Sequence, residues 1–118
     1  MTAFNFKLYM APKILDGTKL STIRSTKRCN VGDVMQLYTG MRTKSCHKIR
    51  DVVCVGVASI IISRYSLWQL GETEGNVCPS IAPLHEQEGF LNAFEMVEFF
   101  AKEYGLPYRG FLHAWRPE

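Results

Sequence analysis

One uninterrupted run of strand-forming residues constrains the fold of this chain more than any other feature. The run extends from Ile49 to Ser63, is rich in Val and Ile, and contains a single glycine, Gly56, near its middle. A usual strand has about 5–6 residues, and a membrane-spanning helix needs about 20 apolar ones, so the run fits neither. We therefore predict one long strand with a bulge or bend near Gly56, as part of a curved sheet.

The segments around this run predict an α+β domain. Period-two alternation indicates a strand at 4–10, and residues 11–17 are typical of one or two helical turns, beginning at Pro12 and ending at Gly17. Crossover helices are lacking between the middle strands, which disfavours a parallel βαβ sheet. We expect a small β-barrel of mostly antiparallel strands, with a short N-terminal helix and one long helix near the C-terminus. The remaining strands are expected at 20–25, 34–38, 64–70 and 108–115, with a loop at 71–83.

The long helix is expected over "NAFEMVEFFAKEY", residues 92–104. Asn92 and Glu95 have the spacing of a capping box, and Gly105 followed by Pro107 is typical of a helix end. Apolar residues at helical spacing are expected to face the core. They are Phe90, Phe94, Val97, Ala101 and Tyr104.

Composition places the chain among ordinary globular proteins. The 118 residues are 47% hydrophobic and 21% charged, and we expect one domain over residues 1–118. The first residues lack a basic start followed by an apolar run and a cleavage site, so no signal peptide is predicted. The expected location is the cytoplasm, without a membrane partner.

The cysteines do not predict a metal site. None of the four belongs to a CxxC pair, so free thiols are favoured and neither a metal nor a cofactor is expected. The alternative is that Cys46 and His47 meet His85 or His113 in space as zinc ligands. The cysteines are Cys29, Cys46, Cys54 and Cys78.

Basic residues are concentrated in the first part of the chain. Residues 1–71 hold 11 Lys and Arg against 3 Asp and Glu, a net charge of +8, whereas residues 72–118 hold 3 against 8, a net charge of −5. The segment from Lys19 to Arg50 contains eight basic residues and one acid, Asp33. Such a local excess favours contacts with phosphate or an RNA backbone. A solvated basic face without a ligand is the alternative that charge alone leaves open.

Three polar residues form a candidate acyl-transfer site: Lys19, Thr22 and Glu88. The hydroxyl would attack a carbonyl, the amine would take the hydroxyl proton, and the carboxylate would hand a proton to the leaving amine. A lysine with its ordinary pKa of about 10.4 is a poor base at neutral pH, so the pKa of Lys19 would have to fall by about three units. Burial and the neighbouring Arg24 both act in that direction.

Strand geometry limits which of these side chains can converge. Lys19 and Thr22 have opposite parity and would point to opposite faces of one strand, unless Lys19 belongs to the turn after Gly17. Thr22 and Arg24 share parity and are expected on the same side. The plainer alternative is a strand-favoured Thr22, a solvated turn lysine at position 19, and Glu88 as a charge ahead of a helix.

At these residues the chain resembles a known family. "ILDGTKLSTIR" followed by "VGD" is similar to the opening signature of the ASCH domain, a PUA-like β-barrel family, and "EQEGF" resembles its acidic residue and Gly-Phe before the second helix. The resemblance runs nearly end to end. It is nearest to small phage and prophage members with a similar "LYTGMRTKSC" loop, which would place the protein in a host-cell cytoplasm.

The resemblance implies a PUA-like fold with a polar cleft. One ASCH branch consists of N4-acetylcytidine amidohydrolases, whose Lys, Thr and Glu correspond to Lys19, Thr22 and Glu88. Another branch is a ribonuclease, and many members are regarded as RNA binders. The chain departs from the amidohydrolase pattern at Leu20 and Ser21 and in the basic insert 39–48, which could reshape the cleft mouth, add phosphate contacts or change the substrate.

An RNA or nucleotide ligand is the first functional hypothesis. Stacking partners for its bases would come from Tyr38, Tyr65 and Trp68, although core packing is the alternative role of each. The expected basic rim consists of Arg24, Lys27, Arg28, Arg42, Lys44 and Lys48.

Two enzymatic hypotheses stand beside it. The first is hydrolysis of an acylated nucleoside by the three acyl-transfer residues. The second is a metal-independent ribonuclease with His47 or His85 as acid and base, and Lys19 or Arg24 stabilising the phosphate. The oligomeric state is left open.

Overall fold

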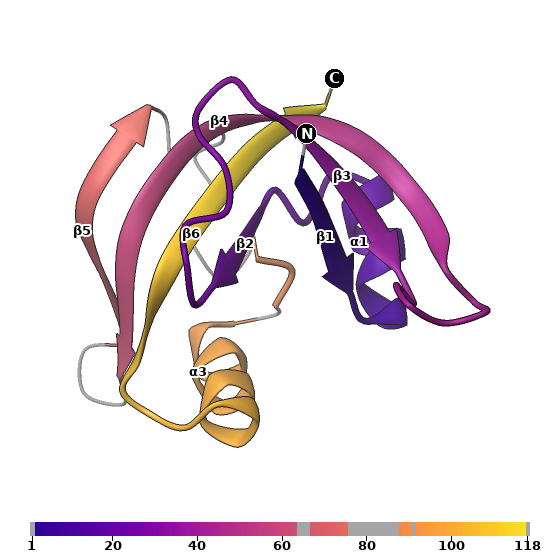
Figure 1. The fold of residues 1–118 in the computed structure, drawn as a ribbon. Coiled ribbons are helices and arrows are strands. Elements are labelled where there is room, and N and C mark those ends of the chain that lie inside the picture. Colours follow the sequence, from indigo (N-terminus) through magenta and orange to yellow (C-terminus); the bar gives the residue numbers. More distant parts are fainter. Residues whose placement is uncertain (1, 64–66, 76–87, 91, 118) are drawn as a thin grey trace.

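The computed structural model describes residues 2–63, 67–75, 88–90 and 92–117, which form one curved sheet with helices beside it (Figure 1). The class is α+β, as predicted. In chain order the elements are strand β1 (Thr2–Phe6), the 3-10 turn η1 (Leu8–Met10), helix α1 (Ala11–Leu15), strands β2 (Ser21–Arg24), β3 (Val34–Thr39), β4 (His47–Ser63) and β5 (Leu67–Gly75), helix α3 (Ala93–Glu103) and strand β6 (Tyr108–Pro117).

The sheet is mostly antiparallel, as expected, but it is not closed into a barrel. The strand order is β1–β3–β4–β6–β2, with β5 also paired to β4, and β1–β3 is the one parallel pair among the described strands. Side chains bridge the two outer strands. Arg24 at the end of β2 and Arg28 just beyond it donate to the carbonyl oxygens of Asn5 and Ala3 on β1, at 2.8 and 2.9 Å. Guanidinium groups therefore occupy the edge of β1 that a closing strand would need.

Strand β4 confirms the predicted long strand and its bend. It has 17 residues; its first part pairs with β3, its second part with β5, and β6 lies along the other edge. The ladder with β6 shifts register between Cys54 and Gly56, where the bulge was expected. Because a bulge increases bending and twist, one strand can serve both ends of the arched sheet, and α3 lies beneath the arch (Figure 1).

The core is formed by alternate residues of the strands. Met35 and Leu37 on β3 are fully buried, and the residue between them is only half-buried. Phe6 at the end of β1 packs edge-to-face on Trp115 of β6, with ring centroids 6.2 Å apart. Burying each such side chain stabilises the fold by roughly 1.5–3 kcal/mol, which holds β1 and β6 at a fixed separation.

Two predicted segments have different ends in the structure. The first strand stops at Phe6 rather than at Met10, because the chain turns through η1, with the Met10 N–H donating to the Lys7 carbonyl at 2.9 Å, and enters α1. Leu8 is consequently 77% exposed, although the alternation placed it inside. Residues 71–75, expected in a loop, belong to β5 and pair with β4, and residues 76–83 lie outside the described residues.

Helix α3 has the predicted cap but a different buried face. The Asn92 side chain accepts from the Glu95 N–H at 2.8 Å, as in a capping box. Phe94 and Tyr104 are 70% and 58% exposed, so their predicted core positions are wrong. The buried side chains of the helix are Met96, Val97 and Phe100, so the helix is rotated about its axis relative to the predicted orientation. Tyr104 lies beyond the last helical residue, at the C-cap position. The described part of the chain has no helix that is long and apolar enough to span a bilayer.

Candidate functional site

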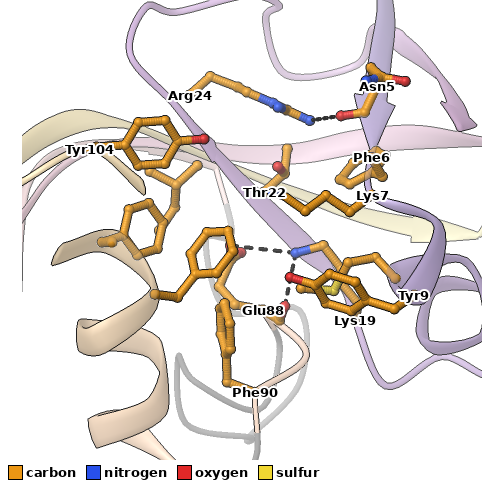
Figure 2. A pocket seen from close by; sticks show the side chains of 14 residues that line it. Asn5, Phe6, Lys7, Tyr9, Lys19, Thr22, Arg24, Glu88, Phe90 and Tyr104 are labelled. Carbon is orange, nitrogen blue, oxygen red and sulfur yellow. Dashed lines mark hydrogen bonds and ion pairs between the residues drawn. The ribbon is translucent and has the colours of Figure 1, made fainter. Parts of the chain in front are cut away.

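A pocket of about 210 Å³ opens between β1, β2, the turn at 88–90 and α3 (Figure 2). Polar and aromatic groups share its wall. The lining residues are Asn5, Phe6, Lys7, Tyr9, Met10, Lys19, Thr22, Ile23, Arg24, Glu88, Phe90, Phe99, Phe100 and Tyr104. The pocket thus contains all three residues of the predicted acyl-transfer site, together with Arg24.

Lys19 is a buried lysine whose amine points into this pocket (Figure 2). It precedes β2, and its N–H donates to the Lys13 carbonyl at 3.0 Å, which ties it to the end of α1. Its Nζ donates to the Glu88 carbonyl oxygen at 2.9 Å and lies 3.5 Å from Glu88 Oε1. Burial lowers the pKa of Lys19, the Arg24 charge lowers it further, and the Glu88 carboxylate opposes both. The amine is therefore shifted in the direction that a general base requires.

Glu88 is held from two sides, which fixes its carboxylate beside the lysine. The Ser21 hydroxyl donates to Glu88 Oε2, and Lys19 faces the other oxygen. The next residue, Gly89, has φ of +90°, a left-handed conformation that glycine adopts without strain, and its carbonyl accepts from Lys13 Nζ. The turn thereby brings Glu88 into contact with Lys19, from which it is separated by 69 residues in the sequence.

Thr22 and Arg24 lie on the same side of β2, as their parity predicts, and both line the pocket. Thr22 is buried and faces the same hollow as Lys19. Their convergence is possible because β2 begins only at Ser21, so Lys19 belongs to the preceding turn rather than to the strand. The structure therefore meets the condition under which Lys19 and Thr22 can line one pocket, which is that Lys19 lies ahead of the strand.

Arg24 forms the upper wall of the pocket in Figure 2. Its guanidinium carbon lies 5.0 Å from the centroid of Phe6 and 5.6 Å from that of Phe4, within range of cation–π contacts. Burial lowers the pKa of Arg24, and the charge of Arg28 acts in the same direction. Two like charges therefore lie close together at this edge.

The structure brings two of the six predicted basic residues together and separates the others. Arg28 lies beside Arg24, with its guanidinium carbon 4.8 Å from the Phe4 centroid. Lys27 pairs with Glu74 at 3.2 Å, and Lys48 pairs with Asp51 at 2.9 Å, so their charges are balanced locally. Arg42 and Lys44 are exposed between β3 and β4 and do not line the pocket.

The aromatic wall was not identified from the sequence. Tyr38, the stacking candidate on β3, does not line the pocket; Tyr65 and the side chain of Trp68 lie outside the described residues. The wall comes instead from the turn and α3, where Phe90 and Phe99 have ring centroids 5.3 Å apart. The two adjacent phenylalanines at 99–100 were the available sequence signal of an aromatic wall, but the direction in which they point depends on how α3 packs.

Ser21 is the second residue that sequence reasoning missed. It was noted only as a departure from the amidohydrolase pattern, yet its hydroxyl contacts the Glu88 carboxylate in a buried setting. No spacing rule could show this contact, since 67 residues separate the two.

The described histidines lie outside the pocket. His47 is exposed at the start of β4, and His85 lies outside the described residues. His113 is fully buried on β6, opposite Thr22 in the ladder, and its Nε2 accepts from the Arg28 N–H at 3.1 Å. Burial lowers the pKa of His113 to about 4, so the ring is neutral at physiological pH.

Cysteines and metal-binding groups form no further site in the described ranges. Cys29, Cys46 and Cys54 are free; the first and last of these are buried, and the Cys54 thiol donates to the Gly56 carbonyl at 3.6 Å. Across the described residues, no three His, Cys, Asp or Glu side chains gather in a way that could hold a metal ion. Cys78 lies outside that part of the chain.

Comparisons of the chain with protein-family models, curated proteins and solved structures find no match.

The chemistry available at the pocket is defined by its own groups. A buried amine with a lowered pKa, a carboxylate that contacts it and a hydroxyl on the same wall are the group types that can act as base, proton carrier and nucleophile.

Proposed function

We propose that this pocket binds a nucleobase-containing ligand and hydrolyses an acyl amide carried by the base, as in N4-acetylcytidine. The observation that carries the proposal is the buried contact between Lys19 Nζ and Glu88 in a pocket that Thr22 also lines. Removing a lysine and a glutamate from water is costly, and a pair kept at the wall of an open pocket indicates chemistry there. The ligand would be a nucleoside, a nucleotide or a residue of RNA.

The proposed reaction uses each group once. Neutral Lys19 Nζ takes the Thr22 hydroxyl proton as Thr22 Oγ1 attacks the acyl carbon. The proton passes through Glu88, 3.5 Å from Nζ, to the leaving nitrogen, and the C–N bond breaks. Water then hydrolyses the threonine ester, so that one amide and one water give one amine and one carboxylic acid. Arg24 at the wall supplies positive charge for the developing oxyanion.

The size and lining of the pocket favour a single base as the ligand. Its volume of about 210 Å³ is below the range of about 300–1,000 Å³ that is usual for drug-sized ligands. The flat aromatic groups Phe6, Phe90 and Tyr104 offer stacking surfaces, which bind bases with little sequence preference. Asn5 and Arg24 supply a polar rim for exocyclic groups.

The family assignment is part of the same proposal. The curved, mostly antiparallel sheet with a short and a long helix supports a PUA-like fold, although the described strands do not close into a barrel, and the grouping of Lys19, Thr22 and Glu88 in one pocket supports an ASCH domain. RNA binding without turnover is the second candidate, favoured by the adjacent charges of Arg24 and Arg28. It predicts ligand affinity that falls with salt.

Product release from purified protein tests the proposal. N4-acetylcytidine is incubated with the protein, and cytidine and acetate are quantified by chromatography. Release should fall at least about 100-fold in Lys19→Met and in Thr22→Val, since each removes a group that acts in the transition state. Thr73→Val is the matched control, because Thr73 is an exposed strand threonine on β5 outside the pocket. Activity that survives both pocket substitutions would refute the assigned roles.

A further inference from the structure

A second hollow of about 400 Å³ adjoins the pocket on the far side of Arg24. The two hollows share Ile23, Arg24 and Tyr104, so Arg24 is part of the wall between them. Hydroxyl groups and a second arginine line the new hollow. Its residues are Ile23, Arg24, Ser25, Thr26, Arg28, Tyr104 and Tyr108.

The two arginines have unused hydrogen-bonding capacity. Each guanidinium carries five N–H donors, and each is observed to donate to one β1 carbonyl, Asn5 for Arg24 and Ala3 for Arg28. Arg24 Nε is buried and has no hydrogen-bond partner among the described residues. Ordinary folded proteins satisfy such buried donors, so an unmet one beside a hollow points to a missing acceptor.

The positive charges of this pair are not neutralised within the described part of the chain. Neither Arg24 nor Arg28 forms an ion pair there, whereas Lys7, Lys19, Lys27 and Lys48 each have an acidic partner. The guanidinium carbons of both lie near the Phe4 ring, 5.6 and 4.8 Å from its centroid, both arginines line the same hollow, and the charge of Arg28 lowers the pKa of Arg24, so the two like charges repel each other. An anion at the hollow would relieve this repulsion and accept the free N–H groups.

We infer that the hollow between Arg24 and Arg28 binds a phosphate group of the same ligand whose base occupies the adjoining pocket. The inference rests on the proposed function and narrows it, because it makes the preferred ligand a nucleotide or an RNA residue rather than a free nucleoside. Ser25 and Thr26 add hydroxyl donors for the remaining phosphate oxygens. The shared wall at Arg24 lets one ligand contact both hollows, with the sugar passing across the arginine.

Calorimetric titration with unacylated probes tests this inference independently of turnover. Cytidine, cytidine 5′-monophosphate, cytidine 3′-monophosphate and inorganic phosphate are titrated into the protein at low and moderate salt. A short RNA containing cytidine forms a further arm, which separates a terminal phosphate from a backbone phosphate. At least one phosphorylated probe should bind about tenfold or more tighter than cytidine, and its advantage should shrink as salt rises.

A pair of variants locates the effect. In Arg28→Gln the ratio of nucleotide to nucleoside affinity should fall towards one, whereas Arg116→Gln, which removes an exposed arginine from β6 outside both hollows, should keep the ratio. Thermal unfolding of both variants controls for the contact of Arg28 with β1. If Arg28→Gln does not fold, the wild-type ratio and its salt dependence still decide the question.

The outcomes separate the two proposals. Equal affinities for cytidine and every phosphorylated probe would overturn the phosphate site while leaving the base pocket in place. Nucleotide binding no tighter than that of inorganic phosphate would overturn the idea of one ligand spanning both hollows. Failure of every probe to bind, together with no release of cytidine from N4-acetylcytidine, would refute both.

Discussion

Lys19 Nζ lies 3.5 Å from Glu88 Oε1, and both side chains are almost entirely buried, at 4% and 3% exposure. The contact joins the turn before β2 to the turn before α3, and it is reinforced by the bond from Lys19 Nζ to the Glu88 carbonyl. The same pair therefore connects two turns of the fold and lies in the wall of the pocket to which we assign the reaction.

Removing one member of this pair should destabilise the protein strongly. Lys19→Met or Glu88→Gln leaves the other group buried without its partner, which typically costs about 3–5 kcal/mol of unfolding free energy. The double substitution should cost clearly less than the sum of the two, as urea denaturation would show. Lys7 and Glu103 are the control pair, because they are 3.0 Å apart but 53% and 36% exposed, and breaking them should change stability far less. Strict additivity at Lys19 and Glu88 would contradict the observed coupling.

The pKa of Lys19 should respond in opposite directions to its two charged neighbours. Burial lowers this pKa first, Glu88 raises it and Arg24 lowers it. Arg24→Gln should therefore move the Lys19 titration to higher pH, and Glu88→Gln should move it to lower pH. The measurement is NMR of lysines labelled at Cε and Nζ, with exposed Lys44 as the internal reference. An unchanged Lys19 titration in both variants would show that burial alone controls the pKa of the amine, and shifts of the same sign would contradict the opposing effects of the two neighbours.

The lowered pKa of Lys19 also makes the unfolding free energy of the protein depend on pH. Because the folded pKa of Lys19 lies below the unfolded value of about 10.4, the unfolded chain binds more protons between those two pH values. The contribution of Lys19 is therefore favourable above the unfolded pKa and is lost as pH falls through the folded pKa. Urea denaturation at successive pH values should show that the unfolding free energy of the wild type rises with pH in this window, and that the rise is lost in Lys19→Met. Lys44→Met is the control for removing an exposed lysine.

His113 should make the protein sensitive to acid. Burial lowers its pKa to about 4, and the charges of Arg24, Arg28 and Lys27 act in the same direction, while the Thr22 main chain opposes them. Its contribution is fully present above about pH 6.5 and is lost as pH falls through 4, which amounts to roughly 3 kcal/mol at most. His113→Asn should flatten the stability profile between pH 6.5 and 4 relative to the wild type. An unchanged slope would mean that the ring is charged in the folded state.

The exposed histidine provides the control for this measurement. His47 lies at the start of β4 and is accessible to solvent, so His47→Asn is the matched substitution that removes an imidazole without altering the core. Carboxylates titrate in the same pH range, and the difference between the two variants removes their common contribution.

Sequence reasoning recovered those features whose causes are local. The length of β4 and its bulge at Gly56 follow from an unbroken run of strand-forming residues with one glycine, and the capping of α3 by Asn92 follows from a three-residue spacing. Strand parity left one condition under which Lys19 and Thr22 can line the same pocket, a lysine in the turn after Gly17, and the structure meets that condition. In each case the decisive interaction lies within a few residues along the chain.

The features that escaped prediction depend on how distant elements pack. The contact of Ser21 with Glu88, the rotation of α3 that exposes Phe94, and the bridging of β1 by Arg28 each join segments far apart in the chain. Glu88 itself was assigned to the site from its chemistry and from the resemblance to a family, since no periodicity relates it to Lys19. The open edge between β1 and β2 has the same origin, because guanidinium groups occupy the position that a closing ladder would take.

Gly89 should be needed for the site beyond its backbone conformation. Its φ is +90°, and a Cβ there would lie 3.2 Å from Lys13 Cδ, so Gly89→Ala would both strain the turn and crowd the Lys13 side chain. Gly105 has φ of +83° with nothing within 4 Å of such a Cβ, and Gly105→Ala therefore reproduces the strain without the contact. Both substitutions should cost about 1–2 kcal/mol of unfolding free energy. Only Gly89→Ala should also weaken cytidine binding or slow release of cytidine from N4-acetylcytidine, because only that strained turn carries Glu88 and accepts a hydrogen bond from Lys13. Equal losses of function in the two variants would show that the turn at 88–90 does not position the reactive pair.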